Sequence, residues 1–176
     1  MKLTWFGGTT IRVHIGGMIL VGDAAGAPAR IDQTELVSGA DRVFTLDAAE
    51  LQIADAASWK PRRGTRLLDD DGTLPEVLLW AVTGGVLVDA IGEPPLLLAT
   101  GAMADLGRWA DGAVVVLFGD GVALSERGQS LLNARAPKVI ALAAEEAAVD
   151  IAIPALRDRL DGTGLFSLEP GMALEI

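Results

Sequence analysis

The residues of this chain that could do chemistry are mostly carboxylates. Its 176 residues include 24 Asp and Glu, one His and no Cys. A catalytic zinc site needs roughly three protein ligands from His, Cys, Asp or Glu and one open position. Thiolate sites, cysteine nucleophiles and disulfides are therefore excluded, and an imidazole-rich zinc site cannot be assembled.

Other catalytic arrangements lack their parts. The sole histidine, His14, lies in the run 11–15, where strand alternation places it opposite Ile11, Val13 and Ile15 and predicts that it faces solvent. A serine triad would have to recruit this imidazole, and no serine sits in a G-x-S-x-G elbow. The Gly-rich turns match neither phosphate-binding motif. We therefore expect no catalytic residue and no cofactor.

Short apolar or β-branched runs separated by Gly-Gly predict most of the elements. Strands are expected at 2–6, 10–15, 18–21, 42–46, 66–68, 76–82, 86–91, 96–99, 114–118, 139–142, 164–168 and 173–176, the last two forming a final hairpin around Pro170-Gly171. Helices are expected at 103–109, 125–135 and 153–160, with Pro154 in the first turn of the last.

The stretch 48–57 is predicted to be a helix that Asp47 caps, with Glu50 three residues on as in a capping box. The acidic triplet 69–71 is predicted to form a turn. The elements together favour two sheets packed face to face with helices outside. No linker is apparent, so residues 1–176 are expected to form one domain.

Three segments carry a resemblance to a known family. They are MKLTWFGG with GGMILVGD, then GGVLVDAIGEPPLLLATG, and finally SLEPGMALEI. In this order they resemble the metallo-β-lactamase fold, in its branch of L-ascorbate-6-phosphate lactonase-like and related hydrolases. The resemblance implies an α/β (α+β) fold: a trimmed four-layer αββα sandwich of two mixed β-sheets flanked by helices.

The same resemblance implies that the family's metal ligands are missing. The histidine after the first strand is replaced by Gly8, and Thr-His-x-His-x-Asp-His aligns with 45–51, where only Glu50 is still acidic. The later Gly-Asp-Thr aligns with 99–101, around Thr100, and Pro-x-His with 141–143. Residues of the vestigial cleft are then Gly8, Asp23, Asp47, Glu50 and Thr100, with leucines 46, 51 and 142 filling it.

The function expected from this pattern is non-catalytic, namely binding of a ligand or of a partner protein. The alternative is a hydrolase in which Asp23, Asp47 and Glu50 hold Mg²⁺ or Mn²⁺. Candidate contact residues are the four tryptophans, Trp5, Trp59, Trp80 and Trp109, although a buried role is commoner for each. The Ala and Leu content leaves room for a homodimer.

Charge and hydropathy limit the partners. A net charge of −10 argues against nucleic acid, because affinity for phosphate backbones rests on Lys and Arg. The basic cluster Lys60, Arg62, Arg63 and Arg66 is predicted to be a solvated loop. No run approaches the roughly 18 apolar residues of a membrane span, and no signal peptide is seen at the N-terminus, so a cytoplasmic protein is expected.

Overall fold

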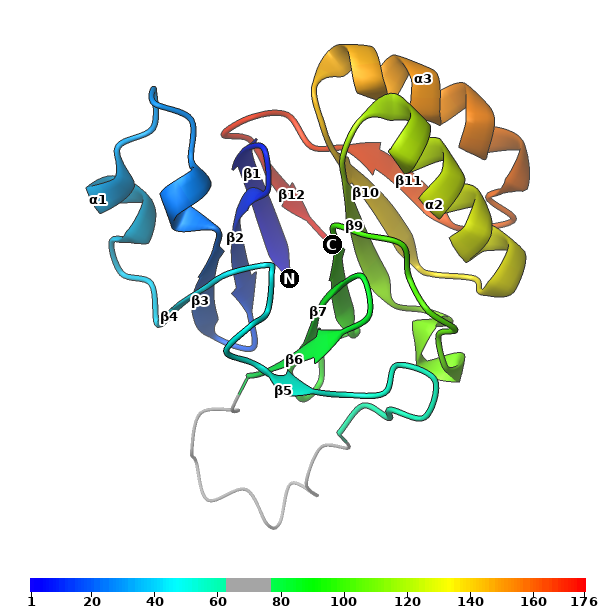
Figure 1. Cartoon of the computed structure of the whole chain (residues 1–176), viewed down its shortest axis with the longest axis horizontal. Coiled ribbons are helices and arrows are strands. Elements are labelled where there is room, and N and C mark those ends of the chain that lie inside the picture. The colour runs from blue at the N-terminus through cyan, green and yellow to red at the C-terminus, as the bar shows by residue number, and fades with distance from the viewer. Residues whose placement is uncertain (63–76) are drawn as a thin grey trace.

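Two mixed β-sheets pack face to face in an α+β fold, as the sequence predicts (Figure 1). The structure is a computed structural model that describes residues 1–62 and 77–176. Helix α1 lies outside one sheet, and α2 and α3 lie outside the other. The predicted strand 66–68, the predicted turn 69–71 and residues Arg63 and Arg66 fall outside the described residues.

The first sheet has five strands in the order β12-β1-β2-β3-β4. Neighbours are antiparallel except β3 and β4, which are parallel. Its strands are β1 (Lys2–Gly7), β2 (Thr10–Ile15), β3 (Met18–Gly22), β4 (Arg42–Phe44) and β12 (Ala173–Glu175). Inward residues of β1 and β2, such as Leu3 and Val13, alternate with residues that face outward, and this alternation made these strands predictable.

The second sheet has seven strands in the order β11-β10-β9-β8-β7-β6-β5. Strands β8 to β11 run parallel, and β7 is antiparallel to both of its neighbours. Its strands are β5 (Gln52–Ile53), β6 (Leu78–Val82), β7 (Gly85–Asp89), β8 (Leu96–Ala99), β9 (Val114–Phe118), β10 (Val139–Ala143) and β11 (Gly164–Ser167). The apolar run 114–118 is fully buried, because both faces of β9 are covered.

The final hairpin of the prediction is wrong, because the last two strands belong to different sheets. Leu168 still donates its N–H to Leu142 O beside β10, at 2.8 Å. Three residues later Gly171 donates to Trp5 O in β1, at 2.7 Å, with φ at 79°. This left-handed glycine lets the chain cross from one sheet to the other, and β12 then pairs with β1.

The helices are α1 (Gln33–Val37), α2 (Gly121–Ala134) and α3 (Glu146–Leu156). Helix α3 begins seven residues before the predicted start, and Pro154 lies inside it, in its last turn. The reason is the spacing of Val149, Ala152 and Leu156, which is helical and buries one face against the sheet. The predicted helix 103–109 is also wrong, since only a short 3₁₀ turn forms at Arg108–Ala110.

The core has two layers, one on each face of the seven-stranded sheet. Val114, Val116 and Phe118 of β9 point to the layer between the sheets. Val115 and Leu117 point to the layer under α2 and α3. None of the helices in the described part of the chain has the length and hydropathy to cross a membrane.

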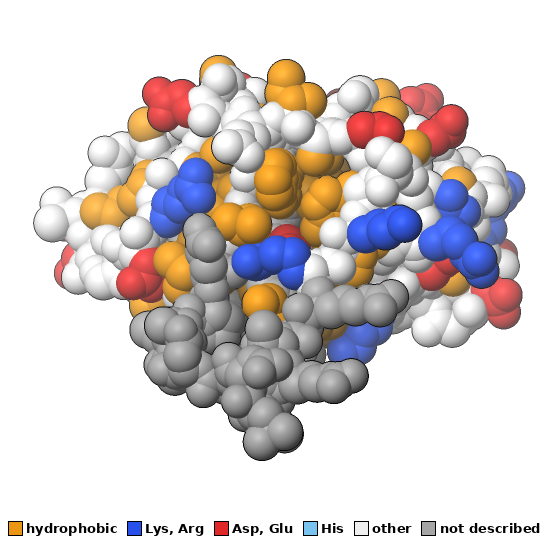
Figure 2. Space-filling view, turned by 90° about the horizontal axis from the view of Figure 1, so that it is seen from below, with side chains coloured by type: hydrophobic (Ala, Val, Ile, Leu, Met, Phe, Trp, Pro, Cys, Tyr) orange, Lys and Arg blue, Asp and Glu red, His pale blue; other side chains and the backbone are white. Residues whose placement is uncertain are grey.

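The basic loop is anchored as well as solvated. Arg62 Nε lies 2.6 Å from a carboxylate oxygen of Asp89, whose side chain is buried at the end of β7. One member of the predicted solvated loop, Arg62, is therefore held by an ion pair. Figure 2 shows the lower end of the molecule, where several Lys and Arg side chains lie beside an apolar area and most Asp and Glu side chains lie toward the rim.

Candidate functional site

Gly8, Asp23 and the loop after β4 lie near one another at one end of the five-stranded sheet. Trp5 Nε1 donates to Gly8 O at 2.9 Å, and the buried Thr10 hydroxyl donates to Asp23 O at 2.9 Å. Asp23 Oδ1 accepts the N–H of Leu46 at 2.7 Å. The ends of β1, β3 and β4 are therefore held together by hydrogen bonds that include the Asp23 carboxylate.

The segment 48–57 is not a helix, which corrects the prediction of a capping box at Asp47 and Glu50. Asp47 Oδ1 accepts from the Thr45 hydroxyl at 2.5 Å and from Ala49 N–H at 3.3 Å, and Ala48 has a φ of 58°. Asp thus closes a local turn instead of opening a helix. These hydrogen bonds, that from Thr45 foremost, hold the pKa of Asp47 below its ordinary value.

Glu50 and Thr100 take different positions. Glu50 is exposed and lines a pocket of about 440 Å³ along β4 together with Asp47. Thr100 lies on the other sheet, where its N–H donates to Gly84 O in the β6–β7 turn at 3.0 Å.

The donor set does not fit the metal that the family resemblance implies. Within residues 1–62 and 77–176, no three His, Asp or Glu side chains form a group that could hold a metal ion. Asp23, Asp47 and Glu50 therefore do not converge into the carboxylate site that the alternative hypothesis requires. Two of these three carboxylates accept hydrogen bonds that shape the loops.

The leucines predicted to fill the cleft occupy two different places. Leu46 is buried in the layer between the sheets, and the half-buried Leu51 packs against the same layer. Leu142 lies in the layer under α2 and α3, on the opposite face of the sheet. Leu142 therefore does not fill a cleft with the other two. Its neighbours Ala141 and Ala143 face the five-stranded sheet instead, as does Val139 at the start of β10.

Two of the four tryptophans are buried, so they are not contact residues. Trp5 packs between the sheets, and its exposed fraction is 2%. Trp109 is buried under the other layer, where Nε1 donates to Ala56 O at 2.6 Å. Trp59 packs against Trp109 edge to face at 5.3 Å between ring centroids, and Trp59 and Trp80 are half-buried.

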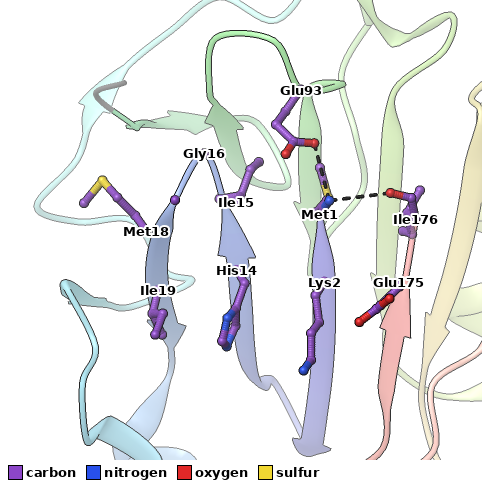
Figure 3. A pocket seen from close by; sticks show the side chains of 11 residues that line it. Met1, Lys2, His14, Ile15, Gly16, Met18, Ile19, Glu93, Glu175 and Ile176 are labelled. Carbon is purple, nitrogen blue, oxygen red and sulfur yellow. Dashed lines mark hydrogen bonds and ion pairs between the residues drawn. The ribbon is translucent and has the colours of Figure 1, made fainter. Parts of the chain in front are cut away.

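His14 lies on the outer face of the five-stranded sheet, as predicted. The strand register aligns Ile19, His14, Lys2 and Glu175 in one row across β3, β2, β1 and β12. Figure 3 shows these side chains directed to the same side of the sheet, next to a shallow pocket of about 470 Å³. Partial burial, followed by the charges of Arg12 and Lys2, lowers the pKa of His14. The imidazole is therefore held in its neutral form to lower pH.

Sequence reasoning missed one further hollow. A groove of about 600 Å³ lies between α3 and the chain that follows β11, and Glu145, Asp150, Ile153 and Glu169 are among its lining residues. The signal was present, because Asp150 and Ile153 are three residues apart and share a helix face. It was hidden because the helix was predicted to begin only at 153.

Comparisons with known proteins give a distant structural similarity. No model of a protein family and no curated protein sequence matches the chain. Among solved structures the chain is similar to Igni18, described as a novel metallo hydrolase from the hyperthermophilic archaeon Ignicoccus hospitalis KIN4/I. The identity is 11% over 99% of this chain and 98% of that chain, with a TM-score of 0.47. The family that the three sequence segments suggest stays a prediction.

Proposed function

We propose that this chain is a non-catalytic protein that uses a two-sheet sandwich to bind a partner protein. The observation that supports this proposal is the state of the carboxylates near the loop after β4. Asp23 and Asp47 accept hydrogen bonds from backbone N–H groups at 2.7 and 3.3 Å, and Leu46, which donates to Asp23, is buried in the core. These groups hold a loop in place, which is a structural task.

The test is metal binding by the whole chain. We expect dialysed, tag-free protein to carry no stoichiometric metal, and its unfolding midpoint to stay unchanged when Zn²⁺, Mn²⁺ or Mg²⁺ is added. If the chain bound an ion, a free ion concentration of about 100 times the dissociation constant would stabilise the native state by about 2.7 kcal/mol. A stabilisation of this size is readily measured.

A paired set of variants makes the result specific. Asp47→Asn with Glu50→Gln removes two candidate ligands, and Glu126→Gln with Asp158→Asn removes two exposed carboxylates elsewhere. If an ion stabilises the natural chain and only the first pair abolishes that effect, the proposal is wrong. The carboxylate hydrolase would then be the better explanation, and hydrolysis should be assayed next.

A further inference from the structure

Strand β11 is an edge strand that lacks the usual protection against pairing. Isolated edges are commonly shortened or charged so that other chains do not add to them. Among the described residues, β4 carries Arg42, β12 carries Glu175, and β5 has only two residues. Strand β11 reads Gly-Leu-Phe-Ser, with no charge, and within residues 1–62 and 77–176 its only neighbour is β10.

The free side of β11 presents backbone groups for another strand. Gly164 and Leu168 donate their N–H groups toward β10, to carbonyls at 2.9 and 2.8 Å. Because successive residues of a strand direct these groups to opposite sides, Leu165 and Ser167 direct theirs away from β10. No strand of the described chain lies on that side. The edge can therefore accept main-chain hydrogen bonds from an extended segment.

The two faces of this edge differ in chemistry. On the α3 side, the groove is lined by the carboxylates of Glu145, Glu146, Asp150 and Glu169 and by no Lys or Arg. On the other face, the Phe166 ring is 45% exposed. An added strand alternates its side chains between these faces. Cationic side chains of the added strand would enter the groove, and its apolar side chains would contact Phe166.

Charge also decides against a second copy of this chain as the occupant. Pairing two β11 edges would bring two acidic grooves together, on chains that each carry a net charge of −10. A basic segment instead gains from the same field. Building on the proposed binding function, we infer that β11 accepts, as an added strand, an extended segment of a partner protein in which Lys or Arg alternates with apolar residues.

The experiment measures binding of a labelled peptide of alternating Lys and Val by fluorescence anisotropy. Asp150→Lys with Glu169→Lys reverses charge in the groove. Glu126→Lys with Asp158→Lys makes the same change in net charge at exposed positions outside it. We expect the groove pair to weaken binding about tenfold and the control pair to change it by less than about twofold. An alternating Glu and Val peptide should not bind.

A second measurement tests the strand pairing itself. N-methylation of one set of alternate peptide residues should abolish binding, while methylation of the other set should leave it, because only one set faces the β11 backbone. Equal loss in both variant pairs would show non-specific attraction and overturn the inference. Equal binding of both methylated peptides would overturn it too. So would a dimer of this chain that Phe166→Lys dissociates, because β11 would then pair with a second copy.

The β11 inference rests on the proposed function, but the two experiments can fail separately. A chain that binds neither metal nor peptide would refute the β11 inference and leave the non-catalytic proposal standing. A chain that binds metal and hydrolyses a substrate would refute the proposal, whatever the peptide does.

Discussion

Replacing Asp23 tests whether its carboxylate is structural. Asp23 Oδ1 accepts the part-buried N–H of Leu46 at 2.7 Å, and Asp23 itself has a φ of 49°. Loss of a hydrogen bond to a charged group costs about 1.5–3 kcal/mol. An alanine held in the left-handed region costs about 1 kcal/mol more. We therefore expect Asp23→Ala to lower the free energy of unfolding by about 3 kcal/mol.

Two further variants separate these contributions. Asp23→Gly removes the hydrogen bond but tolerates the left-handed backbone, so we expect a loss of about 2 kcal/mol. Asp23→Asn keeps an oxygen acceptor and a residue type that visits this conformation, so about 1 kcal/mol should be lost. Glu126→Ala, at an exposed helix position, is the control and should change little.

The assay is urea unfolding followed by tryptophan fluorescence, because Trp5 is buried near this site. Unfolding should be measured in the presence of a metal chelator. A ligand whose only task is to bind metal contributes nothing to stability there, whereas a loop-holding carboxylate contributes fully. A loss below about 0.5 kcal/mol for Asp23→Ala in chelator would refute the reasoning, since the hydrogen bond alone is worth more than that.

Three other outcomes can be measured on the same footing. Arg62→Met should cost about 3 kcal/mol in urea unfolding, because the buried Asp89 carboxylate loses its partner, and adding Asp89→Leu should recover at least half of that loss. Gly128→Ala should cost about 1–3 kcal/mol, because its new methyl would lie 2.7 Å from α3 side-chain atoms, whereas Gly26→Ala, with open space around it, should cost under about 1 kcal/mol. His14 should titrate by NMR below the ordinary histidine pKa, mainly because burial disfavours its charged form. The unfolded state then binds the proton more readily, so stability should fall as the pH drops from the ordinary histidine pKa toward the folded one, and His14→Gln should remove that slope.

Much of the fold could be predicted because its strands carry their own signal. A strand buried on one face, such as that around Val13, alternates apolar and polar residues, and a strand buried on both faces, such as 114–118, is an unbroken apolar run. Both patterns can be recognised in the sequence. The region after β4 could not be predicted in the same way. There Asp47 has two local options, a helix cap or a turn, and the Thr45 hydroxyl and the left-handed Ala48 favour the turn.

The candidate site was predicted less well, because a site depends on which residues face the same space. Gly8 and Asp23 do lie at the same end of one sheet, since β1 and β3 are both antiparallel to β2 and therefore end on the same side. Leu142 was misplaced by one step of strand alternation, which moves a side chain to the opposite face of the sheet. Thr100 directly follows β8 of the other sheet, and only the strand pairing of β8 reveals this.

Edge position is harder still to predict, because it is a property of the topology and not of a strand's own residues. The run Gly-Leu-Phe-Ser-Leu, ending at Leu168, carries no charge that would mark an edge, and the expected hairpin would have paired it with 173–176. In the structure the chain crosses to the other sheet at Gly171, so β12 pairs with β1 and leaves β11 with one neighbour. The same crossing that closes the five-stranded sheet thus opens the edge of the seven-stranded one. An uncharged strand left open in this way requires either a partner or a cost in aggregation, and the carboxylates of the adjacent groove favour a basic partner.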